Sequence, residues 1–119
     1  MGIAASLDEA LAARAGFVKV AFDGAALAPN DQLDWHPDSD RELYSRLIHH
    51  VRAAMSERRG PGRVCLGALF WVQGESDAKS GGAGFVSEQP AAAMAYEGNL
   101  TTLVQRLRHD LSAPDLPII

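Results

Sequence analysis

The chain has 119 residues, of which 47% are hydrophobic and 22% charged, and its formal net charge is -4 at pH 7. This length predicts a single domain over residues 1–119, built around one hydrophobic core. The mild negative charge argues against a nucleic-acid-binding surface, and no apolar run is long enough to cross a membrane, so neither partner is expected. The first residues lack the basic and then apolar pattern of a secretion signal, and the cellular compartment stays open.

The amino-terminal part of the chain alternates helix and strand patterns. A capping-box pattern begins at Ser6, and the alanine-rich residues behind it predict a helix over 7–15. β-Branched and aromatic residues predict a strand over 17–22, which is apolar on both faces and leads into a turn at Gly24. Residues 25–38 show no period and are predicted to form a loop.

The middle of the chain repeats this order. A second capping box at Ser39 precedes the most regular helical pattern of the sequence. The apolar residues that recur on one face of this helix are Leu43, Tyr44, Leu47, Ile48, Val51, Ala54 and Met55. Residues 64–71 then predict a second buried strand, in which Cys65 is expected to be a packing residue rather than a nucleophile.

The remainder of the chain adds a third unit. Residues 80–90 are rich in glycine and predict a long connection, which is either a lid or a disordered segment. The last helical pattern runs from Pro90 to about Leu111, and residues 116–119 look like the start of another strand. The apolar face of this helix is predicted to hold Tyr96, Leu100, Leu103, Val104, Leu107 and Leu111. The alternation of helices and apolar strands predicts an α/β fold with a parallel sheet between helices.

Polar residues follow the predicted strand at 64–71, and their sequence is Gln73-Gly74-Glu75-Ser76-Asp77. The carboxyl ends of parallel strands form one edge of a sheet, so this cluster and Gly24 are predicted to lie on the same rim. The Gln73 amide offers two N–H donors that suit a developing oxyanion, and Gly24 allows the backbone to approach a ligand closely. The alternatives are a turn glycine for Gly24 and a solvated loop amide for Gln73.

The carboxylates of this cluster favour a structural role. Glu75 and Asp77 stand on one turn without a histidine beside them, and glycosidase or metal chemistry requires a second group at a defined separation. Both are therefore expected to shape the turn, and neither a metal nor a cofactor is predicted. Trp35 and Trp71 are interpreted as partly buried packing residues, with stacking on a sugar as the alternative.

The stretch Trp71-Val72-Gln73-Gly74-Glu75-Ser76-Asp77-Ala78 closely resembles the signature of the sialate O-acetylesterase domain. Tyr96, the arginines Arg106 and Arg108, and an Asp-Leu-Pro sequence at Asp115 follow it in the order found in that family. Residues 18–27 look like the family's second sequence block, a strand that leads into a glycine turn. The family includes the acetylxylan esterases of carbohydrate esterase family six and belongs to the SGNH hydrolases.

The resemblance implies a serine esterase that removes O-acetyl groups from carbohydrates of the sialate or xylan type. It implies a three-layer, flavodoxin-like parallel sheet and an acetylated carbohydrate as substrate. By this resemblance, Gly24 and Gln73 contribute to the oxyanion hole. The residues that it implies on the substrate side, or as shaping the site, are Trp71, Gly74, Glu75, Ser76 and Asp77. The chain departs from the family at Val72, where histidine or tyrosine is common, and at Asp23 and Ala25, which flank Gly24.

Two motifs of the family do not occur in the chain: the Gly-Gln-Ser-Asn type motif with the nucleophilic serine, and the Asp-x-x-His block. The chain thus resembles the middle of such a domain, without its first strand and its carboxyl-terminal strands, and is expected to be inactive alone. The strands at 17–22 and 64–71 would lack neighbours, so we expect low stability or self-association through unpaired strands. The alternative function is a non-catalytic carbohydrate-binding or scaffold remnant of the same fold.

Overall fold

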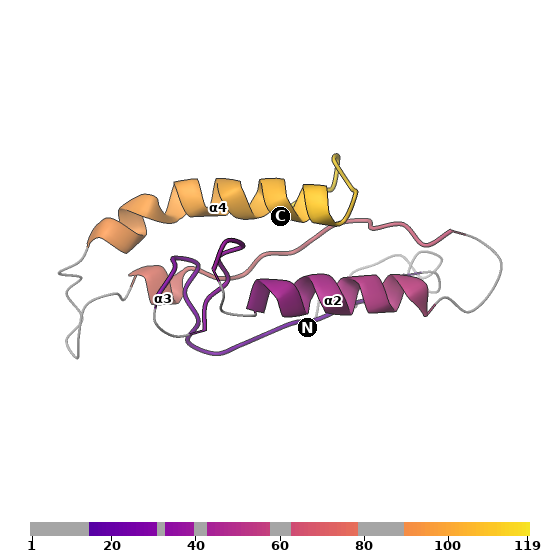
Figure 1. Cartoon of the computed structure of the whole chain (residues 1–119), viewed down its shortest axis with the longest axis horizontal. Coiled ribbons are helices and arrows are strands. Elements are labelled where there is room, and N and C mark those ends of the chain that lie inside the picture. The colour runs from indigo at the N-terminus through magenta and orange to yellow at the C-terminus, as the bar shows by residue number, and fades with distance from the viewer. Residues whose placement is uncertain (1–14, 31–32, 40–42, 58–62, 79–89) are drawn as a thin grey trace.

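A computed structural model describes residues 15–30, 33–39, 43–57, 63–78 and 90–119. Its helices in these ranges are α2 (Leu43–Ser56), α3 (Glu75–Ala78) and α4 (Pro90–Asp110). In Figure 1, α4 runs along the top, α2 lies below it, and the extended residues 63–74 pass between the two. The helix predicted over 7–15 and the glycine-rich connection that precedes Pro90 lie outside the described residues.

Helix α2 confirms the clearest periodic pattern of the sequence. The buried residues along it are Leu43, Tyr44, Leu47, Ile48 and Val51, all of which were predicted for the apolar face. At the end of the helix Met55 is half-buried and Ala54 is exposed, so the packed face narrows there. Residues three and four apart share one side of a helix, and this spacing alone is enough to place α2 against a core.

Helix α4 was predicted from Pro90 to about Leu111 and is observed over Pro90–Asp110. Leu103, Leu107 and Leu111 of its predicted face are buried, whereas the residues nearer its start are half-buried: Tyr96, Leu100 and Val104. The amino-terminal half of α4 thus extends beyond the core, and the carboxyl-terminal half packs into it.

A left-handed residue ends α4. Ser112 has φ 51°, its N–H donates to the carbonyl of His109 at 3.0 Å, and the N–H of Ala113 donates to the carbonyl of Arg108 at 2.9 Å. This pair of hydrogen bonds is a Schellman cap, in which glycine usually takes the left-handed position. The cap reverses the chain, so that Leu116 is buried against the core.

The predicted parallel sheet is wrong. The described ranges contain no strand, and their bridge pairs are two isolated parallel ones, Ala26 with Asp34 and Leu69 with Ile118. The predicted strand at 17–22 has no regular structure there, and Phe17 is 55% exposed. A strand needs hydrogen-bonded neighbours and cover on its apolar faces. In the described part of the chain, residues 17–22 form no ladder, and of their apolar side chains Val20 alone packs against the core, so strand composition alone is not sufficient.

The predicted strand at 64–71 has only a short pairing with the end of the chain. The N–H groups of Leu69 and Trp71 donate to the carbonyls of Pro117 and Ile119 at 2.9 and 2.8 Å, and the Ile119 N–H returns a bond to Leu69 at 2.9 Å. The direction of the pairing is parallel, but its length is that of a single bridge. Cys65 is exposed, so its predicted packing role is also wrong.

The hydrophobic core lies between α2, the second half of α4 and the loop at 25–35. Its members are Ala25, Leu27, Trp35, Leu43, Tyr44, Leu47, Ile48, Val51, Leu103, Leu107, Leu111 and Leu116. Three of these residues come from the loop, which means that a segment without regular structure is anchored by burial of its side chains. This anchoring fixes the loop where it meets residues 73–77.

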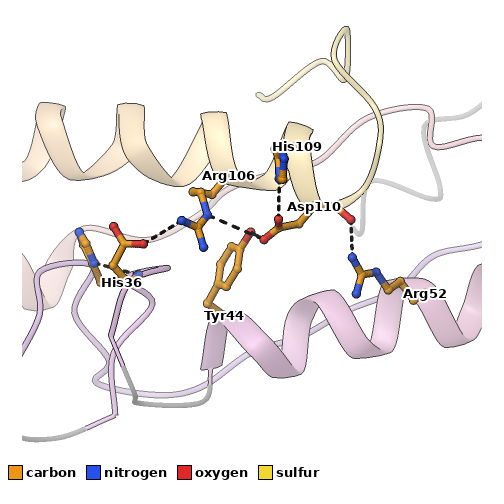
Figure 2. A network of polar contacts seen from close by, with 7 residues as sticks. His36, Tyr44, Arg52, Arg106, His109 and Asp110 are labelled. Atoms are coloured by element: carbon orange, nitrogen blue, oxygen red, sulfur yellow. Dashed lines mark hydrogen bonds and ion pairs between the residues drawn. The ribbon is translucent and has the colours of Figure 1, made fainter.

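A polar network joins α2 and α4 at one edge of the core, as Figure 2 shows. The Tyr44 hydroxyl donates to the carboxylate of Asp110 at 2.7 Å, and the Arg52 guanidinium donates to the backbone carbonyl of Asp110 at 2.6 Å. Arg106 lies 3.0 Å from Asp38 and 3.9 Å from Asp110. The hydrogen bond to His109, the one from Tyr44 and the charge of Arg106 lower the pKa of Asp110. Burial, followed by the bond to Asp110, raises the pKa of Tyr44.

We expect the free energy of unfolding to fall when the pH drops through the pKa of Asp110 in the folded chain. Since this pKa lies below that of the unfolded chain, the carboxylate stabilises the fold fully above about pH 4, and this contribution disappears in acid. Urea unfolding at several pH values between about pH 2 and pH 6 measures this loss of unfolding free energy. In Asp110→Asn the unfolding free energy should depend less on pH. In Asp115→Asn, which changes an exposed carboxylate, the pH dependence should be retained. Equal slopes for Asp110→Asn and the unchanged chain would contradict this expectation.

Candidate functional site

Residues 73–77, which we call the site turn, pack against residues 25–28 through the carboxylate of Asp77. Asp77 is 1% exposed. Its Oδ2 accepts hydrogen bonds from the Leu27 N–H at 2.8 Å and from Gln73 Nε2 at 2.7 Å, and its Oδ1 accepts one from the Ala28 N–H at 2.8 Å. A buried carboxylate needs donors of this kind because burial removes its water. Asp77 therefore ties together two segments that lie 50 residues apart in the sequence.

The amide of Gln73 is fully engaged within the chain. Besides its bond to Asp77, Nε2 donates to the carbonyl of Ala25 at 3.1 Å, so both of its hydrogens have acceptors. On the other side of the amide, Oε1 lies 3.3 Å from the hydroxyl of Tyr96. Ala25 directly follows Gly24, which means that the two residues predicted for an oxyanion hole come from adjoining segments.

Both glycines of the predicted site have positive φ values, 73° at Gly24 and 149° at Gly74. A Cβ at Gly24 would meet no atom within 4 Å, so this position needs glycine for its conformation and leaves open space beside it. A Cβ at Gly74 would stand 3.4 Å from the hydroxyl oxygen of Tyr96. That distance is an ordinary van der Waals contact, so it is the φ value that favours glycine at position 74.

Tyr96 was predicted on the apolar face of a helix and as part of the family pattern, but not as a residue of the site. Its hydroxyl donates to the backbone carbonyl of Gln73 at 2.6 Å. A shallow pocket of about 260 Å³ lies beside this contact, lined by Gln73, Gly74, Asp77, Ala78, Ala93 and Tyr96. The signal that could have revealed Tyr96 is chemical, because a partly buried tyrosine needs a partner for its hydroxyl.

The other predicted site residues surround this centre. Trp71 is half-buried and packs edge-to-face on Trp35, with ring centroids 5.6 Å apart and an interplanar angle of 85°. Its buried Nε1–H has no acceptor among the described residues. Glu75 is exposed and Ser76 is half-buried, both in the short helix α3. Within the described ranges, Gln73 and Asp77 make the hydrogen bonds that join the site turn to residues 25–28 and to Tyr96.

A second buried carboxylate orders the loop that carries Trp35. Asp34 is 1% exposed and accepts hydrogen bonds from the N–H of Asn30 at 3.1 Å, the N–H of His36 at 2.9 Å and the hydroxyl of Ser39 at 3.0 Å. The loop that the sequence predicts without a period is thus held by side-chain oxygens in place of a backbone ladder. Its fixed course presents residues 25–28 to Asp77.

Two kinds of feature are not found in the described ranges. No group of three or more His, Cys, Asp or Glu side chains there is arranged to hold a metal ion. None of the helices in those ranges has both the length and the apolarity that a membrane crossing requires.

Comparison with known proteins identifies the family. The family described as carbohydrate esterase, sialic acid-specific acetylesterase matches residues 2–119. The chain belongs to this carbohydrate esterase family. A probable carbohydrate esterase of Arabidopsis thaliana is similar to it, at 33% identity over 107 residues, or 87% of this chain and 32% of the relative. The chain therefore spans about a third of the length of this curated relative.

Membership in the carbohydrate esterase family confirms the resemblance that the motif at residues 71–78 carries. No solved structure gives a significant match. The individual roles of Gly24 and Gln73 stay predictions. The structure shows where the backbone of Gly24 and the side chain of Gln73 lie.

Proposed function

We propose that this chain forms the oxyanion side of a serine esterase that removes O-acetyl groups from carbohydrates of the sialate or xylan type. The observation that carries the proposal is the contact of 3.1 Å between Gln73 Nε2 and the carbonyl of Ala25, which brings an amide donor next to the Gly24 turn. Membership in a family of carbohydrate esterases supports ester hydrolysis as the reaction.

The two hydrogens of Gln73 Nε2 differ in how firmly they are held. The bond to the Asp77 carboxylate is 2.7 Å long and involves a charged acceptor, whereas the bond to the neutral Ala25 carbonyl is 3.1 Å long. The negative oxygen of a tetrahedral intermediate accepts more strongly than a neutral carbonyl. In the proposed reaction, the oxyanion takes the place of the Ala25 carbonyl as the acceptor of this hydrogen, and the amide keeps its orientation.

The open space beside Gly24 supports the same assignment. An added Cβ at this position would meet no atom within 4 Å apart from its chain neighbours. Close approach of a substrate to backbone is a common reason for glycine at a reactive site. The proposed substrate oxygen would then lie between the Gly24 turn and the Gln73 amide.

The test is ester hydrolysis by the full-length protein that contains this chain. We expect it to release acetate from O-acetylated xylan or O-acetylated sialic acid, to hydrolyse 4-nitrophenyl acetate, and to be labelled by a fluorophosphonate at its serine. The 119 residues alone should do none of these, because the family's serine motif and Asp-x-x-His block are not in their sequence. Turnover by the 119 residues would contradict the assignment of the nucleophile to another part of the protein.

The alternative is a non-catalytic carbohydrate-binding or scaffold role. Its supporting observation is that both hydrogens of Gln73 Nε2 already have acceptors within the chain. Binding of acetylated xylan by a full-length protein that hydrolyses none of these esters would favour this alternative and exclude the esterase.

A further inference from the structure

Gln73 can act on an oxyanion only if its amide plane is held in one orientation, and the structure contains a group suited to this task. We propose that Asp77 is the positioning residue of the site, fixing the Gln73 amide and aligning it with residues 25–28; the kinetic part of this inference rests on the proposed esterase function. Asp77 touches no substrate in this arrangement and acts through Gln73.

The geometry of the Gln73 amide links its two hydrogen bonds. An NH₂ group is planar, so fixing one hydrogen on Asp77 Oδ2 determines where the other points. The bond to Asp77 is the shorter of the two, at 2.7 Å against 3.1 Å for Ala25. At the other end of the amide, the hydroxyl of Tyr96 lies 3.3 Å from Gln73 Oε1. The amide is thereby held from both ends, and its second hydrogen faces the backbone next to Gly24.

One carboxylate holds both halves of the site. The same Oδ2 that accepts from Gln73 accepts the N–H of Leu27, and Oδ1 accepts the N–H of Ala28, both at 2.8 Å. Because Asp77 is 1% exposed, water does not compete for these donors. Movement of residues 25–28 relative to the site turn would therefore break bonds to Asp77.

The acceptor must be a carboxylate. Three N–H donors converge on its two oxygens. An asparagine has one acceptor oxygen, and its NH₂ group would face either the Ala28 N–H or the pair formed by Leu27 and Gln73. Asp77→Asn therefore conserves size but places a donor against a donor.

Amide hydrogen exchange on the ¹⁵N-labelled chain tests the positioning role without any assay of activity. In Asp77→Asn we expect exchange at Leu27, Ala28 or both to accelerate about tenfold or more, as for loss of a hydrogen bond to a charged group. The side-chain NH₂ resonances of Gln73 should move to the values of a solvated glutamine. Asp115→Asn, the same change at an exposed position, should leave both signals in place. Unchanged signals in Asp77→Asn would overturn the proposal.

A second variant keeps the test decisive if Asp77→Asn unfolds. Gln73→Met removes the amide but leaves Asp77 with both backbone donors, so exchange at Leu27 and Ala28 should stay within about threefold of the unchanged chain. Loss of that protection in Gln73→Met would show that Gln73 organises Asp77 rather than the reverse, and would overturn the proposal.

A double-mutant cycle in the full-length esterase gives the kinetic readout with 4-nitrophenyl acetate. Asp77→Asn should lower kcat about 100-fold with little change in KM, as for a misplaced catalytic group. When Asp77→Asn is added to Gln73→Ala, kcat should fall no further, because the amide that Asp77 positions is already gone. Full additivity of the two losses would overturn the positioning role. Absence of hydrolysis by the unchanged full-length protein would refute the proposed function instead, and the exchange measurements would still decide what Asp77 does.

Discussion

Under the proposed function, replacing Gln73 by alanine in the full-length protein should lower kcat for ester hydrolysis by roughly 100- to 1000-fold, the usual effect of removing one oxyanion donor. The effect on KM should be much smaller, because the hydrogen bond is strongest when the substrate oxygen carries its negative charge. Initial rates with 4-nitrophenyl acetate measure both constants.

A matched control is Gln105→Ala, which makes the same change at an exposed position of α4 and should leave both constants unaltered. If Gln73→Ala raised KM and left kcat unchanged, Gln73 would be a ground-state substrate contact and its oxyanion role would be refuted. Circular dichroism should show equal helix content in both variants, because neither side chain belongs to the hydrophobic core.

The second large effect concerns stability. Leu107 of α4 is 0% exposed and lies in the core, so Leu107→Ala should cost about 2 to 5 kcal/mol of unfolding free energy through lost burial and the cavity left behind. That range approaches the whole stability of many domains. We therefore expect the variant to be largely unfolded at 25 °C, as measured by urea titration of the far-ultraviolet signal.

Met94→Ala is the control on the same helix, since Met94 is 79% exposed and its truncation should change the unfolding free energy by no more than about 0.5 kcal/mol. Similar losses in both variants would mean that α4 is held by something other than the packing of Leu107.

The two long helices could be predicted from the sequence because their signal is local. In α2, Leu43, Leu47 and Val51 recur at helical spacing, and all three are buried as expected. In α4 the same spacing predicts Leu103 and Leu107, which are both buried. Each helix satisfies its own backbone hydrogen bonds, so the sequence of the segment is nearly sufficient to predict it.

The strands could not be predicted in the same way because their partners are not local. Residues 17–22 and 64–71 have the β-branched and aromatic composition of strands, but a ladder requires a second segment at the right register. In the described part of the chain, the backbone of Leu69 and Trp71 pairs only with residues 117–119, and Phe17 is 55% exposed. Composition thus indicated the extended backbone at 64–71 without indicating that it would stay outside a sheet.

The candidate site was predicted in part. The sequence pointed to Gln73, Gly24 and the site turn, and the structure brings Gln73 to the residue after Gly24. The sequence did not indicate that Asp77 would accept hydrogen bonds from the N–H groups of Leu27 and Ala28, because hydrogen bonds between a side chain and distant backbone leave no periodic pattern. For the same reason the sequence analysis placed Asp34 in a loop and missed its role as the acceptor that orders that loop.

The edge-to-face pair of Trp35 and Trp71 gives a spectroscopic signal for assembly of the site. The chain contains two tryptophans, and both belong to this one contact between the loop and the residues that lead into the site turn. Intrinsic fluorescence and the near-ultraviolet dichroism of coupled indole rings therefore come from a single place in the molecule. Docking of the loop can be followed without a label, separately from the far-ultraviolet signal of α2 and α4.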